Sequence, residues 1–171
     1  MTTTSAVPAV IDWLVNAAKN SALLGAASPP VSVFDGVQPP VATQSLSQVL
    51  WIGADAPNPD AVFADAAQAW PVMDHARTKD EDGTITCSAQ HWSGDPSAKV
   101  HRDGAKAIVA GVEQLLRGDG QTGPGDATMG RLVLWSGTDV GRWETRQLAG
   151  GVAVLVTFTV IYRARLVTTG A

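Results

Sequence analysis

Apolar residues recur at helical spacing in the stretch that follows Asp95 and Pro96. Asp95 suits the cap of a helix and Pro96 suits its first position, where a missing N–H costs nothing. Gly118 and Gly120 end the pattern. We therefore predict a long amphipathic helix of about 21 residues, roughly 30 Å in length. Its apolar stripe consists of His101, Ala105, Ile108, Val109, Val112, Leu115 and Leu116.

A second helix is predicted near the N-terminus. Ser5 is a suitable cap and Pro8 falls in the first turn. Gly25 ends the region, and the prolines at 29 and 30 prevent the helix from continuing. One face of this helix needs a core or a neighbouring subunit, because it carries Val7, Val10, Ile11, Leu14, Val15 and Ala18.

Residues 152–167 alternate between apolar and polar side chains, the period of a strand with one buried face. The apolar face carries Val152, Val154, Val156, Phe158, Val160, Tyr162 and Leu166, and the other face carries Thr157, Thr159, Arg163 and Arg165. Shorter strands are predicted at 31–34, 48–53, 70–77, 84–92 and 131–136. Residues 48–53 are apolar on both faces, which favours a central position in the sheet.

Turns are expected between these strands. The charged residues 78–83 are predicted to join 70–77 and 84–92 as a hairpin, and 137–141 to form a turn before 142–148 continues the pairing. Residues 60–70 fit either a short helix or an extended, loop-like segment, and we favour the latter. The predicted fold is α+β in a single domain, 1–171, with a mostly antiparallel sheet and both helices packed on one side.

Composition narrows the possible functions. The 171 residues carry 12 Lys and Arg against 16 Asp and Glu, a net charge of −4. A general nucleic-acid binder held by phosphate contacts is therefore not expected. Charged residues make up 16% of the chain, against about 25% in a typical domain. This low charge suggests that partners cover part of the surface.

Neither disulfides nor a membrane segment are expected. Cys87 is the one cysteine, which excludes an internal disulfide framework and a cysteine-based zinc site. The first five residues are not those of a signal peptide. The longest apolar run, 150–161, includes two threonines and falls short of the roughly 20 residues that a bilayer span needs.

No catalytic constellation, metal motif or cofactor motif stands out. His75, His91 and His101 lack the usual spacings of metal ligands, and His101 is predicted to be a core or interface histidine. Cys87 is predicted to be a buried, inert thiol. The acidic residues 80–82 are interpreted as a solvated hairpin tip, with binding to a cation or a basic partner as the alternative. A small enzyme would need His75 or His91 to meet a carboxylate.

The chain contains six tryptophans, a residue type that is enriched at interaction hot spots. We expect four of them in the core and place Trp70 and Trp143, which flank loops, at contacts. The other four are Trp13, Trp51, Trp92 and Trp135.

The order of elements resembles the tail terminator (tail completion) proteins of long-tailed bacteriophages, especially those of actinobacteria. The matching features are an N-terminal helix before the strand that ends at 33–36, and the strand 85–92 followed by Ser93-Gly94-Asp95. An amphipathic helix with Arg102 near its start, a Gly-Asp-rich connection and the closing strand 151–166 complete the set. The resemblance covers nearly the whole chain, although no single motif is specific.

The resemblance implies a non-enzymatic virion protein without a cofactor. Such proteins form a sixfold ring on the last ring of the tail tube, stop its polymerisation and offer a face to the head-neck connector proteins. DNA passes through the lumen as cargo. The chain would then be found at the neck of the virion, and in the host cytoplasm during assembly. Another neck or head-to-tail connector component is the alternative.

We expect the contacts with neighbouring subunits, tube and neck to lie in loops and exposed charges. Arg102, Arg163 and Arg165 are expected to pair with acidic groups of an adjacent subunit. The full candidate set is Asp35, Gly36, Gln38, Gln44, Trp70, Lys79, Asp80, Glu81, Asp82, Arg102, Gly120, Gln121, Arg142, Trp143, Arg163 and Arg165.

Overall fold

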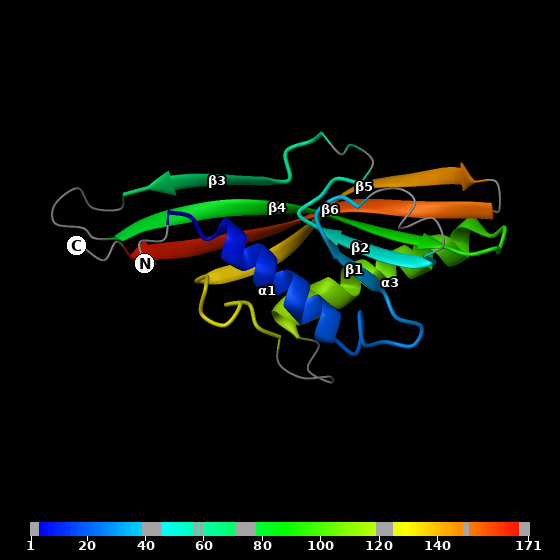
Figure 1. Ribbon diagram of the computed structural model, residues 1–171, viewed down its shortest axis with the longest axis horizontal. Helices are drawn as coiled ribbons and strands as arrows, with labels where there is room; N and C mark the ends of the chain where they lie inside the picture. The colour runs from blue at the N-terminus through cyan, green and yellow to red at the C-terminus, as the bar shows by residue number, and fades with distance from the viewer. Residues whose placement is uncertain are drawn as a thin grey trace.

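The computed structural model describes residues 4–38, 46–56, 58, 60–70, 78–118, 125–148 and 151–167. Two helices and six strands follow one another in these ranges (Figure 1). They are α1 (Val7–Asn20), β1 (Ser32–Asp35), β2 (Gln48–Ile52), β3 (Ala64–Ala69), β4 (Thr78–Trp92), α3 (Ala98–Arg117), β5 (Trp135–Leu148) and β6 (Gly151–Val167). The α+β class predicted from the sequence is confirmed. No helix in the described ranges is long and apolar enough to cross a membrane.

The six strands form one sheet in the order β1-β2-β4-β6-β5, with β3 pairing β4 beside this path. Only the β1–β2 pair is parallel among these strands. Strand β4 is long enough to share one edge between two neighbours: its first half pairs with β3 and its second half with β2. Its other edge pairs along its whole length with β6. The sheet is therefore built around the β4–β6 pair.

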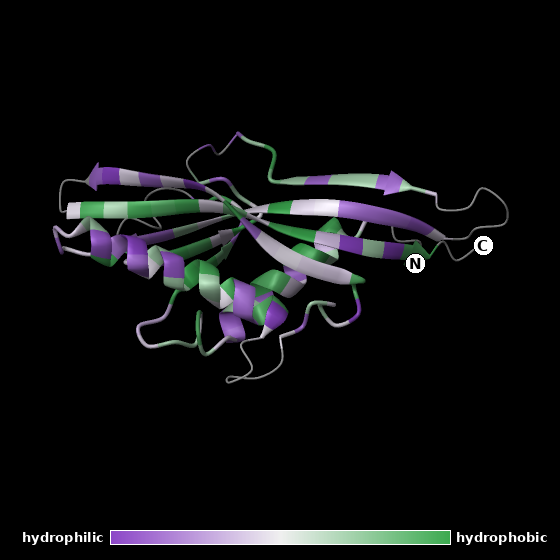
Figure 2. Ribbon diagram, turned by 180° about the vertical axis from the view of Figure 1, so that it is seen from behind, coloured by the Kyte–Doolittle hydropathy of each residue, from purple (hydrophilic) through white to green (hydrophobic). Residues whose placement is uncertain are grey.

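Both helices pack on the same face of the sheet, which we call the inner face (Figure 1). Apolar and polar residues are interspersed along β6, along the second half of β4 and along α3 (Figure 2), and the apolar side chains of these three elements meet in the main core. Alternate residues of β6 from Val154 to Leu166 face the helices and are buried. The predicted alternation of 152–167 is confirmed, and it supplies the centre of the core.

The opposite, outer face holds a smaller apolar cluster. Val49, Trp51, Ala54 and Leu155 are buried there, with Phe34, Leu46 and Ala56 packed against them. The prediction that residues 48–53 are apolar on both faces is thus confirmed, because Leu50 and Ile52 point into the main core. The outer face also carries the paired charges of β4 and β6 and the exposed side chain of Trp135.

Helix α1 begins differently from the prediction. Ala6, not Ser5, is the residue that precedes the first turn, and it makes no side-chain cap. Ser5 Oγ accepts a hydrogen bond from Val7 N at 3.2 Å, and the carboxylate of Glu81 accepts one from Ala6 N at 2.9 Å. A residue from a strand distant in sequence therefore supplies the negative charge that stabilises a helix N-terminus.

Helix α3 begins at Ala98, two residues later than the predicted first residue, Pro96. Ser97 precedes the first turn, and Asp95 Oδ1 accepts a hydrogen bond from Ser97 N at 2.7 Å. The predicted stripe is buried except for Leu115, which is half-buried against the core. Gly118 ends the helix with a φ of 71°, a conformation that favours glycine.

The predicted charged turn at 78–83 is wrong. These residues belong to β4, which runs without interruption to Trp92. The hairpin partner of this segment is β3, inside the stretch 60–70 that we expected to be extended. The predicted strand 70–77 lies outside the described residues except for Trp70. A local turn signal is overridden here because β3 and β6 flank the segment on both sides.

The predicted strand 131–136 and the turn 137–141 are also wrong. Residues 127–134 form turns and bends, and β5 begins only at Trp135. The register of β5 against β6 shifts between Val140 and Trp143, the mark of a β-bulge. At the bulge the backbone approaches Thr157 so closely that a side chain on Gly141 would meet the Thr157 carbonyl at 2.9 Å.

The tryptophan prediction is confirmed in part, and the predicted burial of Cys87 is confirmed. Trp51 is buried, Trp13 and Trp92 are half-buried, and Trp70 and Trp143 are exposed. Trp135 is 45% exposed, so its assignment to the core is wrong. Cys87 is buried, and burial raises the pKa of its thiol to about 12. The predicted burial of this thiol is therefore confirmed.

Candidate interaction surfaces

Paired charges cross the outer face near the start of β4. Asp80 lies opposite Arg165 in the β4–β6 register, and Asp82 lies opposite Arg163. Arg165 donates to both carboxylate oxygens of Asp80, at 2.8 and 3.1 Å, and Arg163 donates to Asp82 at 2.9 Å. The hydrogen bond from Arg165 holds the pKa of the Asp80 carboxyl below its ordinary value.

These pairs change the role expected for two arginines. Arg163 and Arg165 were expected to meet acidic groups of an adjacent subunit, but both have acidic partners within their own chain. The Arg163–Asp82 pair is exposed, and an ion pair of this kind contributes only about 0–1 kcal/mol to folding, whereas the Asp80 carboxylate is half-buried beside Arg165. The two pairs form a ladder of opposite charges across β4 and β6.

Glu81 points to the inner face, so we remove it from the set of candidate interface residues. Its side chain is fully buried, which rules out the predicted solvated tip at this residue. Its carboxylate accepts hydrogen bonds from Ala6 N, the Tyr162 hydroxyl and the Gln68 side-chain amide. Burial raises the pKa of this carboxyl, but the three hydrogen bonds outweigh burial and leave the pKa below its ordinary value.

Lys79 ties the chain ahead of α1 to the sheet. Its ammonium donates to the Gln68 side-chain oxygen at 2.6 Å and to the Thr4 carbonyl at 3.1 Å. Gln68 also donates to the Thr4 carbonyl, at 2.7 Å. Lys79 is therefore a structural contact within the chain, together with Glu81.

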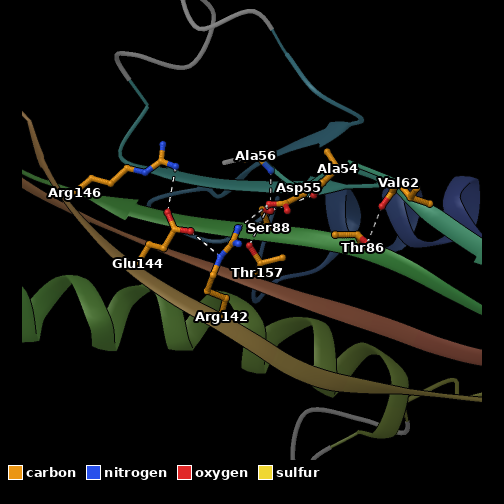
Figure 3. A network of polar contacts seen from close by, with 10 residues as sticks. All are labelled: Ala54, Asp55, Ala56, Val62, Thr86, Ser88, Arg142, Glu144, Arg146 and Thr157. Carbon is orange, nitrogen blue, oxygen red and sulfur yellow. Dashed lines mark hydrogen bonds and ion pairs between the residues drawn. The ribbon is translucent and has the colours of Figure 1, made fainter. Parts of the chain in front are cut away.

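A second polar network lies on the outer face beside the β5 bulge (Figure 3). Arg142 donates to Glu144 at 2.6 Å and approaches Asp55 at 3.5 Å. Arg146 reaches Glu144 at 3.3 Å, and the Thr157 hydroxyl lies 3.4 Å from the Asp55 carboxylate. The network links β5 and β6 to the segment that follows β2.

Ser88 fixes that segment. Its hydroxyl donates to the Ala54 carbonyl and accepts from Ala56 N, both at 3.1 Å (Figure 3). Because Ser88 is itself buried on β4, it holds the backbone on either side of Asp55 against the sheet. The position of the Asp55 carboxylate therefore depends on β4 as well as on β2.

Sequence reasoning named Arg142 but missed its partners. Arg142, Glu144 and Arg146 alternate along a segment that was expected only to continue the pairing, and this period of two was the available signal. Asp55 carried no comparable signal, because it lies in a loop whose path is set by Ser88.

A groove of about 250 Å³ lies where the ends of β1 and β2 meet α1. Ile11 of α1, Val37 and Phe63 contribute its large apolar side chains. Its remaining lining is Asp35, Gly36, Gly53, Ala54, Asp55 and Ala61. Val37 and Phe63 are both about half exposed. The groove therefore brings Asp35 and Gly36, two predicted contact residues, beside an apolar hollow.

The remaining predicted contact residues are scattered. Trp70 follows β3, Arg102 lies near the start of α3, and both are exposed. Gln38 is half-buried and donates to the Asp35 carbonyl at 3.3 Å. Gln44, Gly120 and Gln121 lie outside the described residues.

His91 meets a histidine rather than a carboxylate. Its Nδ1 lies 3.1 Å from Nδ1 of the fully buried His101, whose Nε2 lies 2.8 Å from the Asp95 carbonyl. Burial and the nearby His101 lower the pKa of His91. The prediction for His101 as a satisfied core histidine is confirmed. In the part of the chain that the structure describes, no three His, Cys, Asp or Glu side chains gather as a metal site.

Comparison with known structures relates this architecture to a virus-like assembly. A chain from a structure described as the virion of a native gene transfer agent (GTA) particle superposes with a TM-score of 0.56. This chain shares its fold with a virion chain. The match covers 95% of this chain and 99% of the other, at 15% sequence identity.

Sequence comparison adds nothing to that likeness. No protein-family model matches the sequence, and no curated protein does either. The gene transfer agent chain is thus a relative in fold, matched over almost its entire length.

Proposed function

We propose that this chain is a structural virion protein, a tail terminator that forms a hexameric ring on the end of the tail tube. In this role it ends tube polymerisation, presents a docking face to head-neck connector proteins and leaves a lumen for DNA. It acts without a cofactor and without catalysis. It belongs at the neck of the virion, after assembly in the host cytoplasm.

The likeness to the gene transfer agent chain carries this proposal. It extends over 95% of one chain and 99% of the other, so it concerns a whole subunit and not a shared motif. The surface adds support: the outer face carries charges that are paired in ladders, and the side chains of Trp70, Trp135 and Trp143 are exposed. Exposed aromatic side chains of this kind are typical of surfaces that partners cover.

A different head-to-tail connector is the second candidate. The description of the matching structure names a whole particle, and the same fold likeness supports another component of the neck. The two candidates differ in what the ring contacts. A terminator binds the end of the tail tube, whereas a connector of the head binds the portal side.

The deciding experiment measures mass and shape. Light scattering over a concentration series, with negative-stain images of the heaviest fraction, is expected to give a ring of six 17.7 kDa chains, about 106 kDa. If the chain alone stays monomeric, purified tail tubes are added, since the tube can act as the template. Rings on tube ends support the terminator. Binding to head connectors alone supports the second candidate, and binding to neither contradicts both.

A further inference from the structure

Strand β3 runs along one margin of the sheet, and no other described strand pairs with its outer edge (Figure 1). Its pairing with β4 fixes the direction of its backbone groups. Thr86 N donates to the Phe63 carbonyl at 2.8 Å, just before the strand begins. Hydrogen-bonded and non-hydrogen-bonded pairs alternate along an antiparallel ladder. Ala64, Ala66 and Gln68 therefore turn their backbone N–H and C=O groups away from β4, towards the free margin.

This margin lacks the features that usually protect an edge strand. Proteins protect such edges with very short strands, bulges, proline, lysine or a covering element. Strand β1 has only four residues, and β5 is interrupted by its bulge. Strand β3 has six residues, pairs regularly with β4 and contains neither proline nor lysine. Five of its residues are exposed and four are alanine. Among the described strands, β3 is therefore the edge that is most open to another strand.

Exposed apolar side chains lie at both ends of β3. Val62 precedes the strand and is 73% exposed, and Trp70 follows it directly and is 53% exposed. Both positions keep the two-residue period of Ala66, so an added strand of similar length would cover all three. The free margin thus combines unpaired backbone groups with apolar surface, and contiguous exposed apolar surface marks interaction sites.

We propose that β3 pairs with β3 of a second copy of this chain, antiparallel and centred on Ala66. In this register Ala66 lies opposite its own equivalent, and Ala64 lies opposite Gln68 of the other copy. The outward backbone groups of all three residues are then used, because opposite residues of this kind exchange two hydrogen bonds. The sheet continues from one copy into the other, with both inner faces on the same side.

Neighbouring registers are less favourable. An axis at Asp65 places the carboxylates of the two copies directly opposite each other, and like charges in that arrangement are destabilising. An axis at Ala67 leaves Ala64 without a partner in the other β3. The register centred on Ala66 avoids both faults and brings Trp70 of each copy opposite Val62 of the other. Pairs of an aromatic and a β-branched residue stabilise antiparallel strands.

The size of the contact predicts a weak, reversible dimer. A stable interface of standard size buries about 1,600 Å² in total. Two strands of six residues with their flanking side chains fall short of that area. The contact is two-fold and closes after two copies, whereas a sixfold ring needs contacts between two different surfaces. It therefore goes beyond the proposed function: it joins two free subunits, or one subunit from each of two rings.

Cysteine cross-linking tests the register. Ala66→Cys is treated with a short bis-maleimide over a concentration series. Backbone groups make the pairing, so this substitution removes no side chain that the contact uses. The Cα atoms of the two residues at 66 are expected about 5.5 Å apart, and the expected product is a covalent dimer. Cys87 does not compete, because it is 1% exposed and burial raises its thiol pKa to about 12.

The matched control is Ala69→Cys, an exposed alanine of the same strand. In the proposed register residue 69 lies opposite residue 63, so the two cysteines are roughly 20 Å apart along the strands. A short cross-linker does not span that distance. A dimer from the variant at 66 that the variant at 69 does not give supports the pairing. Equal yields, or no dimer from the variant at 66, overturn it.

Proline at position 66 provides a second readout. Ala66→Pro removes an N–H that points to the free margin, where an edge strand tolerates proline, so its melting temperature should match that of the unmodified chain. We expect the concentration of half-dimerisation, measured by light scattering, to rise at least tenfold. Asp65→Ala should leave it within twofold.

The same measurement separates this pairing from the ring. Equal dimerisation of Ala66→Pro and the unmodified chain would overturn the pairing. Rings whose mass stays at six copies over the whole concentration series, with and without Ala66→Pro, would also overturn it and leave the ring intact. Dimers that Ala66→Pro abolishes, without rings even on tail tubes, would support the pairing and contradict the ring.

Discussion

The Tyr162 hydroxyl donates a hydrogen bond to the Glu81 carboxylate across the β4–β6 pair, at 2.9 Å, with both side chains buried. The two residues are diagonal neighbours in register, since Gly83 is the partner of Tyr162. The glycine leaves room for the tyrosine ring, because a side chain at 83 would overlap it. The same carboxylate holds the first turn of α1, so one buried charge connects both layers of the fold.

We expect Glu81→Ala to lower the free energy of unfolding by about 3 kcal/mol. The substitution leaves buried donors of Ala6 and Tyr162 without an acceptor, and each such group costs about 1–3 kcal/mol. Urea denaturation measures the loss. Asp82→Ala is the control, because it removes an exposed pair worth about 0–1 kcal/mol. Equal losses from the two variants would contradict the structural role of Glu81.

Stability is expected to fall in acid through the same residue. Because its hydrogen bonds hold the pKa of Glu81 below the ordinary value of 4.5, ionised Glu81 favours the folded state. Its contribution is complete above about pH 4.5 and is lost as the pH falls through the lower, folded-state pKa. Unfolding curves between pH 3 and 7 should therefore be less dependent on pH in Glu81→Gln. An unchanged acid dependence in that variant would disprove the assignment.

Gly104→Ala is expected to destabilise the chain although it lies within α3. Helix propensity alone predicts a gain of about 1 kcal/mol. A side chain at this position would overlap the ring of His91, which is held by His101, and such crowding costs about 1–3 kcal/mol. Thermal unfolding compares this variant with Gly94→Ala, where no atom lies within 4 Å. A higher melting temperature for Gly104→Ala would contradict the prediction, because it would show that the His91 ring can move aside at little cost.

Arg163→Ala is expected to weaken assembly more than Arg117→Ala does. Both arginines form exposed ion pairs, Arg163 with Asp82 and Arg117 with Glu113, at 2.9 and 3.2 Å. Each substitution should change the free energy of unfolding by less than about 1 kcal/mol. Ring yield, measured by light scattering at matched concentration, then reports only on the contacts between subunits. Equal yields would remove Arg163 from the interface.

The periodic pattern of apolar residues correctly predicted helix α3 and strand β6. The stripe of α3 and the alternation of β6 are visible in sequence because a single core face imposes a period of 3.6 or 2 on them. The first half of β4 was missed because Asp80, Asp82 and Gly83 resemble a turn. Their stabilising partners, Tyr162, Arg163 and Arg165, lie some eighty residues away. Tertiary pairing overrode the local signal there.

Single residues of the candidate surfaces could be predicted from the sequence, but the groove could not. Trp143 was named because it flanks a predicted loop, and Arg142 and Arg163 were named as candidate contacts of the expected ring; each is a single position that can be selected without knowing the fold. The groove joins α1 with the ends of β1 and β2 and the segment before β3. Such a site depends on how distant segments pack, which no spacing within one segment reveals. Trp135 was placed in the core because, unlike Trp70 and Trp143, it was not expected to flank a loop.

The central position of β6 has a consequence for the order of folding. It pairs with β4 on one side and β5 on the other, and its partners in β4 are all more than about 60 residues away in sequence. Domains dominated by such distant pairings fold slowly, on a scale of milliseconds to seconds. Neither the inner core nor the edge that carries Trp143 can form until residues 151–167 have left the ribosome. Any association between copies that uses this sheet is therefore expected to follow the synthesis of β6, because the sheet has no complete edge before then.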